Sequence, residues 1–121
     1  MSSAAAIFDQ LMQVIEDRRQ NPPLKSYTSQ LFSHGNPRIT AKIAEESREL
    51  IEASTDLAEN AADAAARSHL VHEAADLVYH LLVLLGYHRI PLSDLADELQ
   101  RRCGTSGIDE KASRHEPQSD D

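Results

Sequence analysis

Two pairs of acidic residues have the spacing in this sequence that most clearly suggests chemistry. Glu46 and Glu49 form an E-x-x-E pair, and Glu73 and Asp76 form an E-x-x-D pair. Residues three positions apart lie on the same side of a helix, where like charges repel by roughly a few tenths of a kcal/mol per pair. Such pairs do not stabilise a purely structural helix, so either solvent screens their charges or a cation binds between them.

Both pairs stand in the same relation to the apolar side of a predicted helix. With about 100° per residue, Glu49 lies about 300° from Glu46 on the helical wheel, and Asp76 lies about 300° from Glu73. In each helix the apolar stripe begins at about 20° on the same wheel. The stripes comprise Ile39, Ile43, Leu50 and Ile51 in one helix and Leu77, Val78, Leu81, Leu82, Leu84 and Leu85 in the other. Packing one stripe on the other would bring four carboxylates to one rim.

Four converging carboxylates predict a site for a hard divalent cation. Left unpaired, they would cost roughly several kcal/mol or take up protons, whereas Mg²⁺ prefers oxygen ligands and removes the repulsion. The alternative is that all four are solvated acids beside a core, and the spacing leaves both interpretations open. One cysteine and scattered histidines, including His69 and His72 in HLVH, do not favour a zinc site.

Three further charged residues lie near these acids on the helical wheel. Lys42 falls on the side of Glu46, where it could form an ion pair with a neighbouring acid or bind a phosphate. Glu45 is either a solvated acid or a supplementary ligand or base that orients water. Glu52 lies farther round the helix and is expected to be a surface charge.

The segments that would position these residues are all predicted to be helices, since none shows strand alternation. A first helix contains Ile7 to Ile15 and must end at the prolines of NPP, and a short helical turn is expected at YTSQLF. The second helix should start with Asn36 as N-cap and reach about Ala58. A third should start near Ser68, and a fourth should follow Pro91 in PLSDLADELQRRC.

Length and composition predict one soluble all-α domain. The chain has 121 residues, of which 40% are hydrophobic and only 4% aromatic, as in a helical bundle. We expect the domain to span residues 1–112 and to be followed by a disordered tail over residues 113–121. The net charge of -8 argues against nucleic-acid and anionic membrane partners. A single cysteine and no export or anchor segment are typical of a cytoplasmic protein.

The order E-x-x-E followed by E-x-x-D resembles the signature of the MazG-like all-α nucleotide pyrophosphohydrolases. Longer stretches resemble the phosphoribosyl-ATP pyrophosphohydrolase family of histidine biosynthesis, namely RRQNPPLKSYTSQLF, GNPRITAKIAEESRELIEA, HEAADLVYHLLVLL and SGIDEKASR. The resemblance covers the chain from about Leu11 to Arg114. Ala41 departs from it where a second basic residue is expected, and Ser47 departs where alanine is usual.

The resemblance implies Mg²⁺-dependent hydrolysis of the bond between the α and β phosphates of phosphoribosyl-ATP, which gives phosphoribosyl-AMP and pyrophosphate. On this sequence it implies metal binding by Glu46, Glu49, Glu73 and Asp76 and a catalytic part for Glu45, Glu46 and Glu49. The residues expected to bind the anionic substrate are all basic. They are Lys42, Arg19, Lys25, Arg38, Lys111 and Arg114.

The resemblance also implies a bundle of about four helices that association completes as a homodimer or a larger homo-oligomer. The broad apolar side of the third helix agrees with that expectation. Some members carry a fused phosphoribosyl-AMP cyclohydrolase domain for the next step, which we expect a separate protein to supply here.

Two other functions remain open from the sequence. The four acids would serve equally well in a MazG-like house-cleaning hydrolase of nucleoside triphosphates, although SYTSQL and SGIDEKASR favour the histidine-pathway substrate. A non-catalytic helical module that binds a protein partner is the alternative outside the enzymes.

Overall fold

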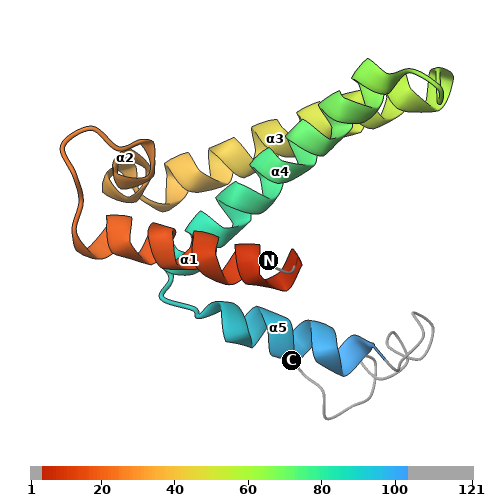
Figure 1. Ribbon diagram of the computed structural model, residues 1–121. Helices are drawn as coiled ribbons and strands as arrows, with labels where there is room; N and C mark the ends of the chain where they lie inside the picture. The colour runs from red at the N-terminus through yellow and green to blue at the C-terminus, as the bar shows by residue number, and fades with distance from the viewer. Residues whose placement is uncertain (1–3, 104–121) are drawn as a thin grey trace, which may run out of the picture. The chain divides into compact units, whose positions relative to one another are not determined.

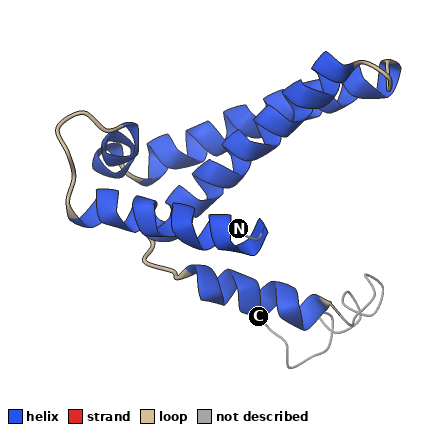
Figure 2. Ribbon diagram, in the orientation of Figure 1, coloured by secondary structure: helices blue, strands red, loops and turns tan. Residues whose placement is uncertain are grey.

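The computed structural model describes residues 4–103, and all regular secondary structure in that range is helical (Figure 2). The helices are α1 (Ala4–Gln20), α2 (Tyr27–His34), α3 (Asn36–Glu59), α4 (Ala64–Tyr87) and α5 (Leu92–Arg102). The expected all-α class is confirmed. The described residues divide into two compact units, one with α1 to α4 as far as Ile90 and one with α5 from Pro91. The tail expected over residues 113–121 lies outside the described range.

α1 and α2 begin and end for identifiable local reasons. α1 stops just before Pro22 and Pro23, as the sequence predicts, because proline has no backbone N–H to continue a helix. The Ser26 hydroxyl caps α2 by accepting a hydrogen bond of 3.2 Å from the backbone N–H of Ser29. Gly35 then ends α2 with a φ of +82°, a backbone conformation that residues with a side chain rarely adopt. This glycine allows α3 to start at the very next residue.

Two predicted helix starts are wrong by a few residues. Gly35, not Asn36, is the N-cap of α3, because the Gly35 carbonyl accepts the first helical N–H groups while the Asn36 side chain lies 3.1 Å from His88 Nε2. α4 starts at Ala64 and not near Ser68, because Asp63 caps it by accepting hydrogen bonds from Ala65 and Ala66. The structure therefore adds one helical turn ahead of the predicted start of α4.

α3 and α4 form a helical hairpin, and α1 and α2 pack against one end of it (Figure 1). The core contains buried apolar side chains from all four helices. It consists of Met12, Ile15, Leu31, Ile39, Ala53, Leu82 and Val83. Each large aliphatic side chain buried here stabilises the fold by about 1.5–3 kcal/mol. The predicted packing of the α3 stripe on the α4 stripe is therefore present.

The outer ends of α3 and α4 extend beyond α1 and α2 (Figure 1). Ile51 was expected in the buried stripe of α3 but is 65% exposed, and Leu81 in the stripe of α4 is 41% exposed. Two packed helices cover only one side of each other, so part of a broad apolar stripe stays uncovered. Val71 and, on α1, Phe8 are exposed as well.

By length and composition alone, α4 could cross a membrane. The same description fits the central helix of a soluble bundle, and α4 carries the buried polar residues Glu73 and His80. Ionisable groups are costly in hydrocarbon unless they are paired. The apolar character of α4 is thus weak evidence for a membrane span.

Candidate active site

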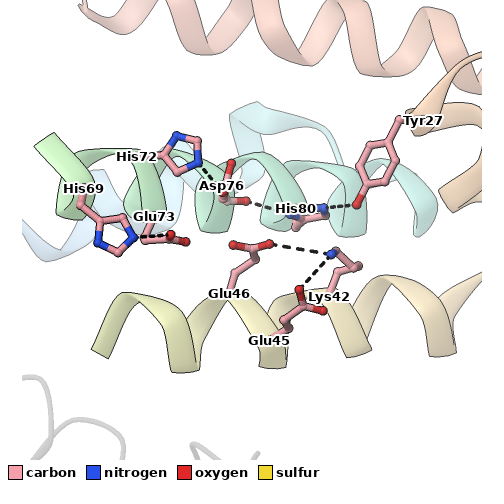
Figure 3. A network of polar contacts seen from close by, with 9 residues as sticks. All are labelled: Tyr27, Lys42, Glu45, Glu46, His69, His72, Glu73, Asp76 and His80. Atoms are coloured by element: carbon pink, nitrogen blue, oxygen red, sulfur yellow. Dashed lines mark hydrogen bonds and ion pairs between the residues drawn. The ribbon is translucent and has the colours of Figure 1, made fainter. Parts of the chain in front are cut away.

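Glu46 of α3 and Glu73 of α4 point toward each other across the interface of the two helices (Figure 3). Their side chains are only 7% and 9% exposed. Burial raises the pKa of Glu46, and the nearby carboxylates of Asp76 and Glu49 raise it further. The structure therefore brings the acids of both pairs into one electrostatic group.

One oxygen of Glu46 and one of Glu73 are buried without a hydrogen-bond partner within residues 4–103. They are the Oε1 atoms of the two side chains. Buried polar atoms are nearly always paired, and an unpaired one costs about 1–3 kcal/mol, more when it is charged. Two such oxygens on facing helices suit a cation that binds between them.

The surrounding donors fit a hard divalent ion. On α3, Glu45, Glu46 and Glu49 offer carboxylate oxygens that lie within 4.8 Å of one another. On α4, Glu73 and Asp76 do the same together with a nitrogen of the exposed His72. Mg²⁺ takes oxygen ligands and tolerates partly exposed sites because it keeps several waters. The acids predicted from the sequence are thus suitably placed to hold this ion.

Lys42 supplies positive charge at the edge of the acid group. Its Nζ donates a hydrogen bond of 3.3 Å to Glu45 Oε2 and lies 3.9 Å from Glu46 Oε2 (Figure 3). Burial lowers the pKa of Lys42, but the hydrogen bond to Glu45 and the charges of the Glu45 and Glu46 carboxylates help to raise it above its ordinary value. Lys42 is therefore a cation at neutral pH, held one turn from Glu46.

The other basic residues predicted to bind substrate are placed differently. Arg38 lies near enough to Tyr27 to influence its pKa, so it is on the Lys42 side of α3. Arg19 pairs with Glu16 of its own helix at 2.6 Å, and Lys25 lies exposed in the turn before α2. Lys111 and Arg114 lie outside the described residues.

His69 and His72 lie beside the α4 acids, a role that the sequence interpretation did not give them. His69 Nε2 donates a hydrogen bond of 2.9 Å to Glu73 Oε2, and His72 Nε2 lies 3.3 Å from Asp76 Oδ2 (Figure 3). Both pairs have the i,i+4 spacing that makes helical neighbours. That spacing was visible in the sequence and could have identified them.

Buried His80 links Asp76 to α2. His80 Nδ1 lies 2.8 Å from the Asp76 backbone carbonyl oxygen, which can only accept, so Nδ1 carries the proton. In the neutral ring Nε2 is then the acceptor, and the Tyr27 hydroxyl donates to it at 2.8 Å (Figure 3). Burial raises the pKa of Tyr27, which keeps the hydroxyl protonated. A second hydroxyl pair, Thr28 with Tyr79, joins the same two helices.

Comparisons with known proteins identify the family of this chain. The sequence profile of the phosphoribosyl-ATP pyrophosphohydrolase family matches residues 8–103. The chain is 46% identical to the phosphoribosyl-ATP pyrophosphatase of Nitrosospira multiformis over 94% of its own length and 87% of that protein. It is 44% identical to the protein of the same name from Dechloromonas aromatica, over 89% and 93% of the two chains. With the one from Geobacter sulfurreducens, the identity is 41% over 96% and 100%. The chain belongs to the phosphoribosyl-ATP pyrophosphohydrolase family.

Proposed function

We propose that this protein hydrolyses phosphoribosyl-ATP to phosphoribosyl-AMP and pyrophosphate with the help of Mg²⁺. The observation that carries the proposal is the facing pair Glu46 and Glu73, each buried and each with an unpartnered oxygen, in a chain of this family. A protein that needed these side chains only for packing would be more stable with neutral residues there.

Glu46, Glu49, Glu73 and Asp76 are the residues that would hold Mg²⁺. When bound, the ion would offset the charge of the triphosphate and polarise a phosphoryl oxygen. Without a cation, the same four acids would repel a polyphosphate. A bound cation would therefore allow the four acids and the anionic substrate to lie close together.

Glu45 is the proposed base that orients the attacking water. Its side chain is partly exposed and lies next to Glu46, so water can reach it. The hydrogen bond from Lys42 to Glu45 Oε2 holds the side chain beside Glu46, and a carboxylate can take a proton from an attacking water. Water attack on the α phosphorus, with its proton taken by Glu45, would break the bond from that phosphorus to the oxygen bridging the α and β phosphates and release pyrophosphate as the leaving group.

Lys42 is the proposed first contact for the substrate phosphates. Arg38, one turn before Lys42 in the same helix, is the next proposed contact. Lys42 is charged and only 19% exposed, so its position is already restricted before the substrate arrives. Such restriction lowers the entropy lost on binding. Arg19, Lys25, Lys111 and Arg114 remain proposed secondary contacts.

The test is a pyrophosphate-release assay with phosphoribosyl-ATP, with and without Mg²⁺. We expect Asp76→Ala to lower the rate by about a thousandfold, equivalent to about 4 kcal/mol of transition-state stabilisation, with helicity retained. The matched control is Asp56→Ala, which removes an exposed acid from the neighbouring helix α3. Equal rates for wild type and Asp76→Ala would refute the site assignment.

The same assay separates the alternatives. Faster turnover of deoxynucleoside triphosphates than of phosphoribosyl-ATP would point to a house-cleaning hydrolase. No pyrophosphate from either substrate would point to a non-catalytic helical module.

We also propose a homodimer or a larger homo-oligomer. Exposed apolar side chains on α1 and α4 support this assembly, among them Phe8, Val71 and Leu81. Sedimentation velocity at several protein concentrations tests it, and a monomer at all of them would contradict it.

We propose a cytoplasmic location, where a single exposed cysteine stays reduced.

A further inference from the structure

The exposed histidines at the edge of the acid group add nitrogen donors that Mg²⁺ does not need. His72 is 69% exposed and lies with Glu73 and Asp76 in a group whose donor atoms are within 4.8 Å of one another. Imidazole nitrogen is a preferred ligand of borderline ions such as Zn²⁺ and Co²⁺, whereas Mg²⁺ selects oxygen. The composition of this group therefore differs from that of the all-oxygen group on α3.

A second observation points to a ligand at this group. The Glu73 side chain is nine-tenths buried, and its Oε1 has no partner within the described residues. His69 occupies the other oxygen, Oε2, through a hydrogen bond of 2.9 Å. That hydrogen bond orients the carboxylate and leaves Oε1 as the atom available to a metal.

The spacing of the exposed donors matches the coordination of a small transition-metal ion. His72 Nε2 and Asp76 Oδ2 are 3.3 Å apart. Two ligands at about 2.0–2.1 Å from one tetrahedral ion lie about 3.4 Å from each other. The pair would thus need little movement to share an ion.

We propose that His72, Glu73 and Asp76 form a binding site for a borderline divalent transition-metal ion, with Zn²⁺ as its representative. His69 acts through Glu73 as a positioning residue. The sequence alone did not favour zinc because its histidines looked scattered, whereas the helix places two of them one turn before two acids.

Binding changes the tautomer of His72. In the metal-free protein the neutral ring can donate to Asp76 only if Nε2 carries the proton. To bind a metal through Nε2, the ring must carry its proton on Nδ1, which can exchange with solvent because the side chain is exposed. The change leaves the charge of the ring unaltered and gives a spectroscopic signal of its own.

Glu73 and Asp76 are also proposed ligands of Mg²⁺, so the two ions must compete. The Zn²⁺ affinity of the protein should fall in proportion as Mg²⁺ is added. An ion that uses His72 gains from imidazole, whereas Mg²⁺ does not. Loss of His72 should therefore affect the two ions unequally.

The first experiment measures Zn²⁺ affinity of the metal-stripped full chain, by competition with a colorimetric chelator at about pH 7.5, where histidine is mostly neutral. We expect His72→Ala to bind Zn²⁺ at least about tenfold more weakly than wild type. His34→Ala, which removes an exposed histidine of α2, is the matched control and should change the affinity less than twofold. Equal affinities for wild type and His72→Ala would overturn the proposal.

Two further measurements would distinguish metal binding by His72 from a merely structural role. Its replacement should change the Mg²⁺ affinity less than twofold, and an equal loss for both ions would mean that His72 only supports Asp76. In long-range ¹H–¹⁵N spectra, Zn²⁺ should move the His72 proton from Nε2 to Nδ1, and an unchanged tautomer at saturation would contradict direct ligation. No nucleotide is present, so these results are independent of the proposed substrate.

Discussion

Glu46 in α3 and Glu98 in α5 are both glutamates in helices, yet their environments are opposite. Glu98 is exposed and accepts hydrogen bonds of 2.6 Å from Arg101 and 2.9 Å from Arg102, which lower its pKa to about 2. Glu46 is buried, its nearest cation is 3.9 Å away, and burial followed by the charge of Asp76 raises its pKa.

The difference lies in where the neutralising charge comes from. In α5, Arg101 and Arg102 follow Glu98 by three and four positions, so the charge of Glu98 is balanced within its own helix. α3 meets α4, which brings two more acids to Glu46. The group of acids around Glu46 needs a cation from outside the helix pair, whereas Glu98, with two arginines on its own helix, does not.

The largest expected effect is on turnover by Glu46→Gln. Glutamine keeps the shape of the side chain but is a weak ligand for Mg²⁺, so pyrophosphate release from phosphoribosyl-ATP should fall by about a thousandfold or more. Glu52→Gln, an exposed position on the same helix, is the control and should stay within twofold of wild type. A similar loss in both variants would mean that α3 itself is damaged, which circular dichroism would reveal.

Mg²⁺ should stabilise the wild-type fold and leave Glu46→Gln almost unaffected. An ion that binds only the folded protein adds about 2.7 kcal/mol at one hundred times its dissociation constant. Thermal unfolding in Mg²⁺ and in a chelator measures this difference. A melting temperature of the wild type that does not change with Mg²⁺ would contradict this prediction and the proposed contrast between Glu46 and Glu98.

The pH dependence of stability without metal should follow Glu46. Its folded pKa lies above the ordinary value of 4.5, so the folded protein holds the proton more tightly than the unfolded chain. The stabilisation is complete below about 4.5 and is lost as the pH rises through the raised pKa. Urea unfolding in a chelator should show this loss in the wild type but not in Glu46→Gln.

The sequence predicted the acid group because helical periodicity is regular. Counting about 100° per residue was enough to place Glu46 and Glu73 in the same phase, and packing of the apolar stripes did the rest. The same counting overestimated the burial of Ile51, since two packed helices cover only one side of each other and leave part of a broad apolar stripe exposed. The predicted helix start was wrong where the capping residue was not recognised, as with Asp63 before α4.

The contacts of His80 could not be predicted from the sequence. Tyr27 lies 53 positions away, and only the packing of α2 on α4 brings its hydroxyl to the ring. No local pattern encodes a hydrogen bond over that separation. The His69 and His72 pairs, in contrast, are local and follow from i,i+4 spacing.

Tyr27→Phe should have a moderate effect on stability. The variant keeps the aromatic ring but leaves buried His80 Nε2 without its donor, which costs about 1–3 kcal/mol. Urea unfolding measures the loss, and Tyr87→Phe provides a control for removing a hydroxyl from the same unit. A stability equal to that of the wild type would show that water replaces the hydroxyl.

The smallest effect is expected for Glu98→Gln, although its two arginines lower the pKa of Glu98 to about 2. Its low pKa means that the stabilisation exists above about 4.5 and is lost as the pH falls through about 2, the opposite sign to Glu46. Solvent screens an exposed pair, so removal of the charge should be visible only at low salt. Pyrophosphate release should change less than twofold, because this acid already has its cations within α5. A loss as large as that of Glu46→Gln would mean that Glu98 also serves the metal, and the distinction between a balanced and an unbalanced acid would fail.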